Sequence, residues 1–147
     1  MRMIQMTINS KNQEMKNKQL ENCVFCKMVK GEMSCVKIWE DEKHFAFLDS
    51  NPIMAGHTLV IPKKHTDYVF DLSDEEYAEL MLKSKKVGVN IGKKLGPKRV
   101  GIAVEGFGVP HVHIHLVPIN KGYELNPLNA KPAKVKDLEK IAEKILK

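Results

Sequence analysis

The sequence predicts an α+β domain: a five-stranded antiparallel sheet with one long helix and a C-terminal helix. Five short runs rich in β-branched and aromatic residues are separated by turn-forming residues, a pattern typical of strands. The helical segments fall between and after these runs instead of alternating with every strand, which favours an antiparallel sheet. With 147 residues, 43% of them hydrophobic and 29% charged, the chain has the composition of one globular domain.

The first residues of the chain differ from the rest. Residues 1–21 are rich in Asn, Gln and Lys, contain no aromatic residue and show weak hydrophobic periodicity. Such a segment buries little apolar surface, so we expect a flexible N-terminal extension. Residues 22–147 are then expected to form a single domain that includes a helical C-terminal tail.

The first half of this domain contains one short helix and three strands. Apolar residues at helical spacing follow Cys23 and stop at Gly31, which predicts a short helix. Two β-rich runs, 36–40 and 44–49, flank a polar turn and are expected to pair as a hairpin. A third strand is expected over 58–61, where Pro62 ends it.

The second half contains the long helix. Ser73 followed three residues later by Glu76 forms a capping box, and Gly96-Pro97 ends an apolar pattern with a period close to 3.6 residues. Two more strands are expected over 100–104 and 112–117, and a closing amphipathic helix over 135–145.

The positive charge of the chain lies at its two ends. The formal charge of +6 comes from 24 Lys and Arg residues against 18 Asp and Glu residues. Residues 1–20 and 121–147 each contribute +3, so the residues between them are neutral overall. Basic tails around a neutral centre make a poor nucleic-acid footprint, and we expect nucleic acid not to be the main partner.

Composition also bears on location. The sequence contains no run of eighteen apolar residues and no apolar stretch of the kind that a secretory signal needs, so we expect a cytoplasmic protein without a membrane partner. Its three cysteines do not form an even disulfide framework. Reduced thiols or metal ligands are the expected states.

The segment 110–118 is the most informative part of the sequence. In an extended strand His111, His113 and His115 lie on one face, about 6.6 to 6.8 Å apart in steps of two residues. An imidazole serves near neutral pH as a nucleophile, an acid or a metal ligand. Half-buried histidines on a polar sheet face are one interpretation, and a His-x-His pair of zinc-hydrolase ligands is another. The three residues alone leave these alternatives open.

The run from His111 to Val117 resembles the signature of the histidine-triad (HIT) family of nucleotide hydrolases and transferases, and within it the zinc-containing bacterial-type branch. This resemblance implies a five-stranded antiparallel sheet with a long helix, usually paired into a homodimer whose sheets are continuous. Further segments resemble family landmarks and follow the family's order: Cys23–Lys27, Trp39–Asp41, Phe45–Asp49 and Gly56–His65.

The same resemblance implies a reaction. His113 would attack the α-phosphorus of a purine nucleotide derivative, either a dinucleoside polyphosphate or a nucleoside phosphoramidate. Water would then hydrolyse the nucleotidyl-histidine intermediate and release a nucleoside monophosphate. His115 would contact the phosphoryl oxygens or the leaving group. The protein is thus expected to be a HIT-family hydrolase.

The resemblance also implies a nucleotide-binding site. Asp49 would accept hydrogen bonds from the ribose hydroxyls, and backbone N–H groups near Gly108 would approach the phosphate because glycine has no Cβ. Phe25, Met28 and Phe47 match positions that surround the base. Membership of the ordinary hydrophobic core is the alternative for these apolar residues.

A metal site is expected at the start of the domain. Cys23-x-x-Cys26 has the spacing of zinc ligands, although such a pair on its own also occurs as a redox dithiol. The family resemblance adds His65 and His111 as ligands of a closed, structural Zn²⁺ site. No chemical role is expected for His44 or His57.

One departure from the family points to a different function. The loop before the triad, Val104–Val109, is short and lacks the amide and hydroxyl side chains that many nucleotide-binding members carry there. The alternative function is therefore a zinc-stabilised nucleotide-binding or interaction module with little turnover.

Overall fold

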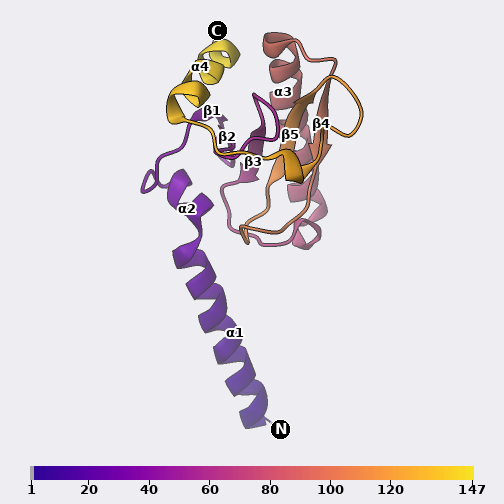
Figure 1. Ribbon diagram of the computed structural model, residues 1–147. Coiled ribbons are helices and arrows are strands. Elements are labelled where there is room, and N and C mark those ends of the chain that lie inside the picture. The colour runs from indigo at the N-terminus through magenta and orange to yellow at the C-terminus, as the bar shows by residue number, and fades with distance from the viewer. Residues whose placement is uncertain (1) are drawn as a thin grey trace.

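The computed structural model describes residues 2–147, which form one five-stranded antiparallel sheet in the order β1-β2-β3-β5-β4 (Figure 1). The sheet, the long helix and the C-terminal helix confirm the predicted fold class. The strands are β1 Lys37–Glu40, β2 His44–Leu48, β3 Thr58–Pro62, β4 Arg99–Ala103 and β5 Ile114–Ile119. The helices are α1 Arg2–Asn22, α2 Val24–Val29, α3 Asp74–Leu95 and α4 Val135–Leu146, with single 3-10 turns at Val69–Asp71 and Pro127–Asn129.

Both faces of the sheet are covered at its centre, so β2 and β3 are buried along their whole length. Side chains alternate between the faces of a strand. Phe45, Phe47 and Leu59 therefore join the apolar cluster beneath α2. Their neighbours Ala46 and Val60 join the larger cluster beneath α3 and α4. The α2 face is the one that bears the triad residues His113 and His115.

The long helix α3 begins and ends as its sequence predicts. The Ser73 hydroxyl accepts a hydrogen bond from the backbone N–H of Glu76, and the Glu76 carboxylate accepts one from the backbone N–H of Ser73. Gly96 ends the helix in the left-handed conformation at φ 68°, which glycine adopts without a steric cost. These two caps fix the ends of the helix that supports the sheet from behind.

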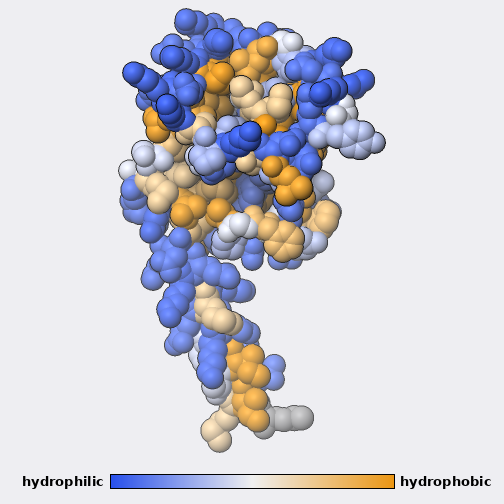
Figure 2. Space-filling model, in the orientation of Figure 1, coloured by the Kyte–Doolittle hydropathy of each residue, from blue (hydrophilic) through white to orange (hydrophobic). Residues whose placement is uncertain are grey.

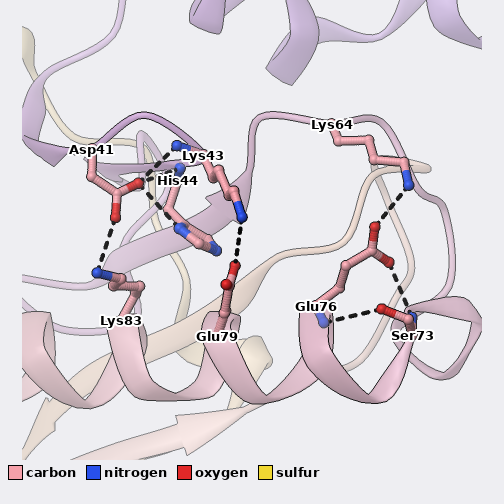
Figure 3. Close-up of polar contacts among 8 residues, drawn as sticks. All are labelled: Asp41, Lys43, His44, Lys64, Ser73, Glu76, Glu79 and Lys83. Atoms are coloured by element: carbon pink, nitrogen blue, oxygen red, sulfur yellow. Dashed lines mark hydrogen bonds and ion pairs between the residues drawn. The ribbon is translucent and has the colours of Figure 1, made fainter.

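Polar contacts tie the β1–β2 turn to the exposed side of α3 (Figure 3). The Asp41 carboxylate lies 3.2 Å from Lys83 Nζ and accepts hydrogen bonds from the backbone N–H groups of Lys43 and His44. Partial burial opposes ionisation of Asp41, but these donors outweigh it and lower the pKa of the carboxyl to about 2. His44, for which the sequence suggested no partner, places Nδ1 3.1 Å from the same carboxylate. Its role is to hold the turn.

The N-terminal segment, expected to be a flexible extension, has helical structure over Arg2–Asn22. Helix α1 projects away from the sheet (Figure 1), and none of its residues is buried. Polar side chains cover most of it, with apolar ones gathered near its first turns (Figure 2). Residues 2–22 contain neither Gly nor Pro, so helix propensity alone favours this conformation. Within residues 2–147, no helix has the length and apolar character needed to cross a membrane.

The last strand starts two residues later than predicted. A strand was expected from Val112, but β5 begins at Ile114. Pro110 has no backbone N–H, His111 donates its N–H to Val109 O at 2.8 Å, and Val112 donates to Thr66 O at 2.7 Å. The backbone before Ile114 is therefore occupied by turn contacts and by the loop after β3, and it does not continue the sheet.

Candidate functional site

A cavity of about 660 Å³ opens on the α2 face of the sheet and is lined by all the residues predicted to bind a nucleotide or to react with it. Its wall includes side chains from α2, β2, the loop before the triad, and the triad itself. These residues are Phe25, Met28, Phe47, Asp49, Gly108, His113 and His115. The structure thus brings together segments that lie up to 90 residues apart in the sequence.

His113 is held with one ring nitrogen free. Its Nδ1 lies 2.7 Å from the carbonyl oxygen of His111, and a carbonyl oxygen only accepts hydrogen bonds, so Nδ1 carries the proton. In the neutral ring Nε2 then has a lone pair. The ring is buried and packs edge-on against Phe25, with centroids 5.3 Å apart. A buried imidazole with a fixed tautomer and an unshared lone pair is suited to act as a nucleophile.

His115 is held in the opposite tautomer through His57. The backbone N–H of Ile53 donates to His57 Nδ1 at 3.0 Å, so the His57 proton lies on Nε2. That nitrogen is 2.9 Å from His115 Nδ1, which therefore accepts, and neutral His115 carries its proton on Nε2. The rings of His113 and His115 lie 4.9 Å apart, and both line the cavity. The site thus combines one lone pair with one neighbouring N–H donor.

His57 is a functional residue for which sequence reasoning found no role. It is buried, and its Nε2 also lies 3.6 Å from a carboxylate oxygen of Asp49. His57 lies two positions before Leu59, the residue that pairs with His115 across the β3–β5 ladder. The two histidines therefore share a face of the sheet. The register of β3 against β5 reveals that His57 and His115 are neighbours, and no local pattern in the sequence shows it.

Burial favours the neutral forms of His115 and His57. Loss of solvation, together with the neighbouring rings of His113 and His57, lowers the pKa of His115 to about 4. Burial also lowers the pKa of His57, against the opposing effect of the Asp49 carboxylate. His115 is thus a hydrogen-bond donor at neutral pH and not an imidazolium acid.

Cys23, Cys26, His65 and His111 form a second cluster behind the cavity, and their ligand atoms all lie within 4.8 Å of one another. Cys23 Sγ is 3.4 Å and Cys26 Sγ is 3.5 Å from His111 Nδ1. His65 Nδ1 is 3.2 Å from His111 Nδ1 and 3.4 Å from Cys26 Sγ. A tetrahedral zinc ion places two nitrogens roughly 3.3–3.4 Å apart and a nitrogen and a sulfur roughly 3.5–3.6 Å apart. The four residues therefore have the chemistry and spacing to hold such an ion.

The tautomer of His111 fits the same purpose. Its Nε2 lies 2.7 Å from the carbonyl oxygen of Pro62 and must donate, so Nδ1 faces the two cysteines with a lone pair. Burial and the nearby rings of His65 and His113 lower the pKa of His111 to about 4 and keep that lone pair free. Burial and the adjacent Cys23 thiol raise the pKa of Cys26 to about 11. A cation is the group that would relieve this crowding of thiols.

A second possible metal cluster, Asp49 with His57 and His115, fits less well. To ligate a metal through Nε2, His57 would need a lone pair on that atom. Its Nδ1 already accepts the hydrogen bond from Ile53, so the neutral ring presents an N–H at Nε2. The tautomers thus favour a metal at the cysteine cluster and a hydrogen-bond network at this one.

Comparison with known proteins agrees with this arrangement. The HIT domain family model matches residues 30–122, well over half of the chain. The chain belongs to the HIT family. The adenosine 5'-monophosphoramidase hnt1 of Schizosaccharomyces pombe is 37% identical to this HIT protein, over 84% of the chain and 98% of the relative.

Solved HIT structures share the fold. A HIT-like protein from Bartonella henselae superposes with a TM-score of 0.76 at 28% identity, covering 85% of this chain and 94% of its own. A zinc-bound histidine triad family protein from Mycobacterium smegmatis superposes with a TM-score of 0.74, also at 28% identity, covering 86% of this chain and 91% of its own. Cys23, Cys26, Phe25 and Met28 precede the segment that the family model matches.

We predict that His115 stays neutral, with its proton on Nε2, from pH 8 down to about pH 5, because burial holds its pKa near 4. Long-range ¹H–¹⁵N correlation spectra of histidine-labelled protein report both the tautomer and the pKa, and a His115→Asn sample assigns the signal. His57→Ala should give a mixture of the Nδ1–H and Nε2–H tautomers of His115, because it removes the group that donates to His115 Nδ1. A His115 proton on Nδ1, or a pKa close to 6.5, would contradict the assignment.

Proposed function

We propose that this HIT protein hydrolyses nucleoside phosphoramidates through a nucleotidyl intermediate on His113. One observation carries the proposal: His113 Nε2 has a fixed lone pair in a cavity of about 660 Å³, beside the N–H donor of His115. The relative hnt1 is named as an adenosine 5'-monophosphoramidase, which supports a substrate of this class.

In the first step the His113 lone pair attacks the α-phosphorus. The Nε2–P bond forms as the P–N bond to the leaving amine breaks, and the amine departs with a proton taken from solvent. The imidazole ring becomes cationic because Nδ1 keeps its proton. The hydrogen bond from that Nδ1–H to the His111 carbonyl, 2.7 Å long, then strengthens as the charge develops.

His115 stabilises the charge on the phosphoryl oxygens. With its pKa near 4, His115 carries no imidazolium proton to give at neutral pH, so its Nε2–H acts as a fixed hydrogen-bond donor. His57 sets that orientation by donating to His115 Nδ1 at 2.9 Å. In the second step water attacks the phosphorus and releases the nucleoside monophosphate. The surplus proton passes to solvent, and neutral His113 is restored.

The charges around the cavity support an amine leaving group. The cavity wall contains two acidic side chains, Asp49 and Glu139, and among the described residues neither Lys nor Arg lines it. A dinucleoside polyphosphate would bring several further negative charges to this wall, where each is repelled. A phosphoramidate carries less charge and releases a neutral or cationic amine.

We predict that His113→Ala lowers kcat for adenosine 5'-phosphoramidate by at least about a thousandfold, because it removes the nucleophile. Mass spectrometry after rapid acid-free quenching should detect one adenylyl group on the wild type and none on the variant. Free imidazole should partly restore turnover in His113→Gly, where it fills the space left by the ring. Circular dichroism controls for folding.

Residual activity above about a tenth of wild type in His113→Ala would overturn the nucleophilic role. Turnover at that level would mean that the reaction does not need the His113 ring. Binding of AMP by the wild type without turnover of phosphoramidate or diadenosine polyphosphate would instead support the non-catalytic binding module.

We further propose that the cluster of Cys23, Cys26, His65 and His111 holds a structural zinc ion. The ligand-atom spacings and the free Nδ1 of His111 support this, as does the zinc in the Mycobacterium smegmatis structure. Four protein ligands would leave no open coordination position, so the ion would stabilise the fold and would not activate water. Its ligands would tie α2 to the loop after β3 and to the segment that precedes β5.

We predict that Cys23→Ser loses most of its zinc and unfolds at a lower temperature, by roughly 6–12 °C for a loss of about 3 kcal/mol. Elemental analysis of the purified protein and a thermal melt measure the two effects. Cys35→Ser is the matched control, because Cys35 lies outside the cluster. One zinc per chain in Cys23→Ser would refute the ligand assignment.

We also propose a homodimer that pairs two copies of β4. This strand lies at an edge of the sheet, where its outer backbone groups have no partner strand among residues 2–147. Apolar side chains are exposed beside that edge: Ile102 on β4, and Leu82 and Val89 on α3. A two-fold axis beside β4 would cover both the edge and these side chains.

We predict that Ile102→Lys shifts the protein from dimer to monomer in size-exclusion chromatography with light scattering, because two lysines would face each other near the axis. Leu128→Lys, at an exposed apolar residue on a different segment, should leave the dimer intact. A wild type that stays monomeric at high micromolar concentration would refute the dimer.

A further inference from the structure

The C-terminal helix forms part of the nucleotide cavity. Leu138, Ala142 and Ile145 of α4 are buried in the core cluster shared with α3. The chain entering α4 is held by backbone hydrogen bonds from Ala133 N–H to Ser50 O at 2.9 Å and from Lys131 N–H to Pro52 O at 3.3 Å. The core contacts and these two hydrogen bonds fix the position of the helix, while Val135 and Glu139 in its first turns stay exposed at the rim of the cavity.

Three residues of α4 line the cavity: Val135, Leu138 and Glu139. Glu139 is the acidic residue of the three, and it forms no ion pair with any of residues 2–147. Helix α4 lies beyond residue 122, where the match to the HIT domain model ends. Glu139 is thus a polar group of this cavity that the family domain does not supply.

The strand order places Glu139 at the far end of the cavity from the triad. The cavity wall runs from His113 and His115 at β5, through Leu59 on β3 and Phe47 on β2, to Val36 beside β1. Three strand spacings of roughly 4.8 Å separate β5 from β1, about 14 Å in all. Helix α4 packs against β1. With the phosphate at the triad and the ribose near Asp49, the base lies toward α4.

We infer that Glu139 selects guanine nucleotides over adenine nucleotides. A carboxylate offers two acceptor oxygens and no donor. Guanine presents two adjacent donors, its N1–H and its amino group, on the edge remote from the ribose. Adenine presents one amino donor beside a ring nitrogen whose lone pair would face the carboxylate. A paired contact to guanine and a repulsive one to adenine give a discrimination of about tenfold or more.

This inference rests on the proposed function, which places a nucleotide in the cavity with its phosphate at the triad and its ribose near Asp49. Equilibrium binding tests it without turnover. Isothermal titration with GMP, IMP and AMP should give an affinity for GMP about tenfold above that for AMP. IMP, which has the N1–H but lacks the amino group, should fall between them. Glu139→Gln should weaken GMP about tenfold and leave AMP unchanged or tighter, because an amide both donates and accepts.

Glu143→Gln is the matched control: it removes the same charge one helical turn further along α4, at a residue outside the cavity wall. It should change neither affinity by more than about twofold. Equal affinities for GMP and AMP, a Glu139→Gln variant indistinguishable from Glu143→Gln, or no binding of either nucleotide would each overturn the inference. Selective GMP binding without phosphoramidate turnover would uphold it and refute the hydrolase.

Discussion

The hydrogen bonds of His111 are the constraint on which the site depends. Its Nε2–H donates to the carbonyl of Pro62, its Nδ1 faces the two cysteines, and its own carbonyl accepts from His113 Nδ1. One residue thereby connects the Cys–His cluster, the loop after β3 and the tautomer of His113. Phe25 adds an edge-on contact to both rings, with centroids 5.9 Å from His111 and 5.3 Å from His113. A change in the cysteine cluster would therefore alter the position of the His113 ring.

Identical side chains acquire different chemistry here because the backbone decides which nitrogen holds each proton. A carbonyl acceptor fixes the proton on Nδ1 of His113 and on Nε2 of His111. The backbone N–H of Ile53 fixes the proton of His57 on Nε2. That N–H donates to Nδ1 of His115 and so fixes the His115 proton on Nε2 as well. The result is one free lone pair facing the cavity at His113, one facing the cysteines at His111, an orienting residue at His57 and an N–H donor at His115. None of these assignments requires a charged histidine.

The sequence predicted the strands and α3 well because their signals are local. Alternation, turn residues, the Ser73–Glu76 capping box and Gly96 each specify structure within a few residues. The helix α1 escaped detection because hydrophobic periodicity reports a buried face, and α1 buries none. The start of β5 was misplaced because the hydrogen bond from Val112 to Thr66 joins segments that are distant in sequence.

The candidate site divides in the same way. The alternation of His113 and His115, and the spacing of Cys23 and Cys26, are local patterns, and the structure places both pairs where such patterns predict. The partnership of His57 with His115 depends on the register of β3 against β5, two strands separated in sequence by α3 and β4. No turn links these strands directly, so no local sequence signal identifies which residues face each other.

The two segments that flank the matched domain complete the site. Residues 30–122 contain the triad, Asp49 and His57, which are the groups that would react with or orient a phosphate. Helix α2 precedes this range and brings Phe25 and the two cysteines, while α4 follows it and brings Glu139. The reacting end of the cavity is thus built from the sheet, which is rigid because both its faces are covered. The end toward α4 is built from a helix whose exposed positions tolerate change with little cost to the fold. Such a division allows the ligand preference of the cavity to change while the hydrogen bonds around His111 stay intact.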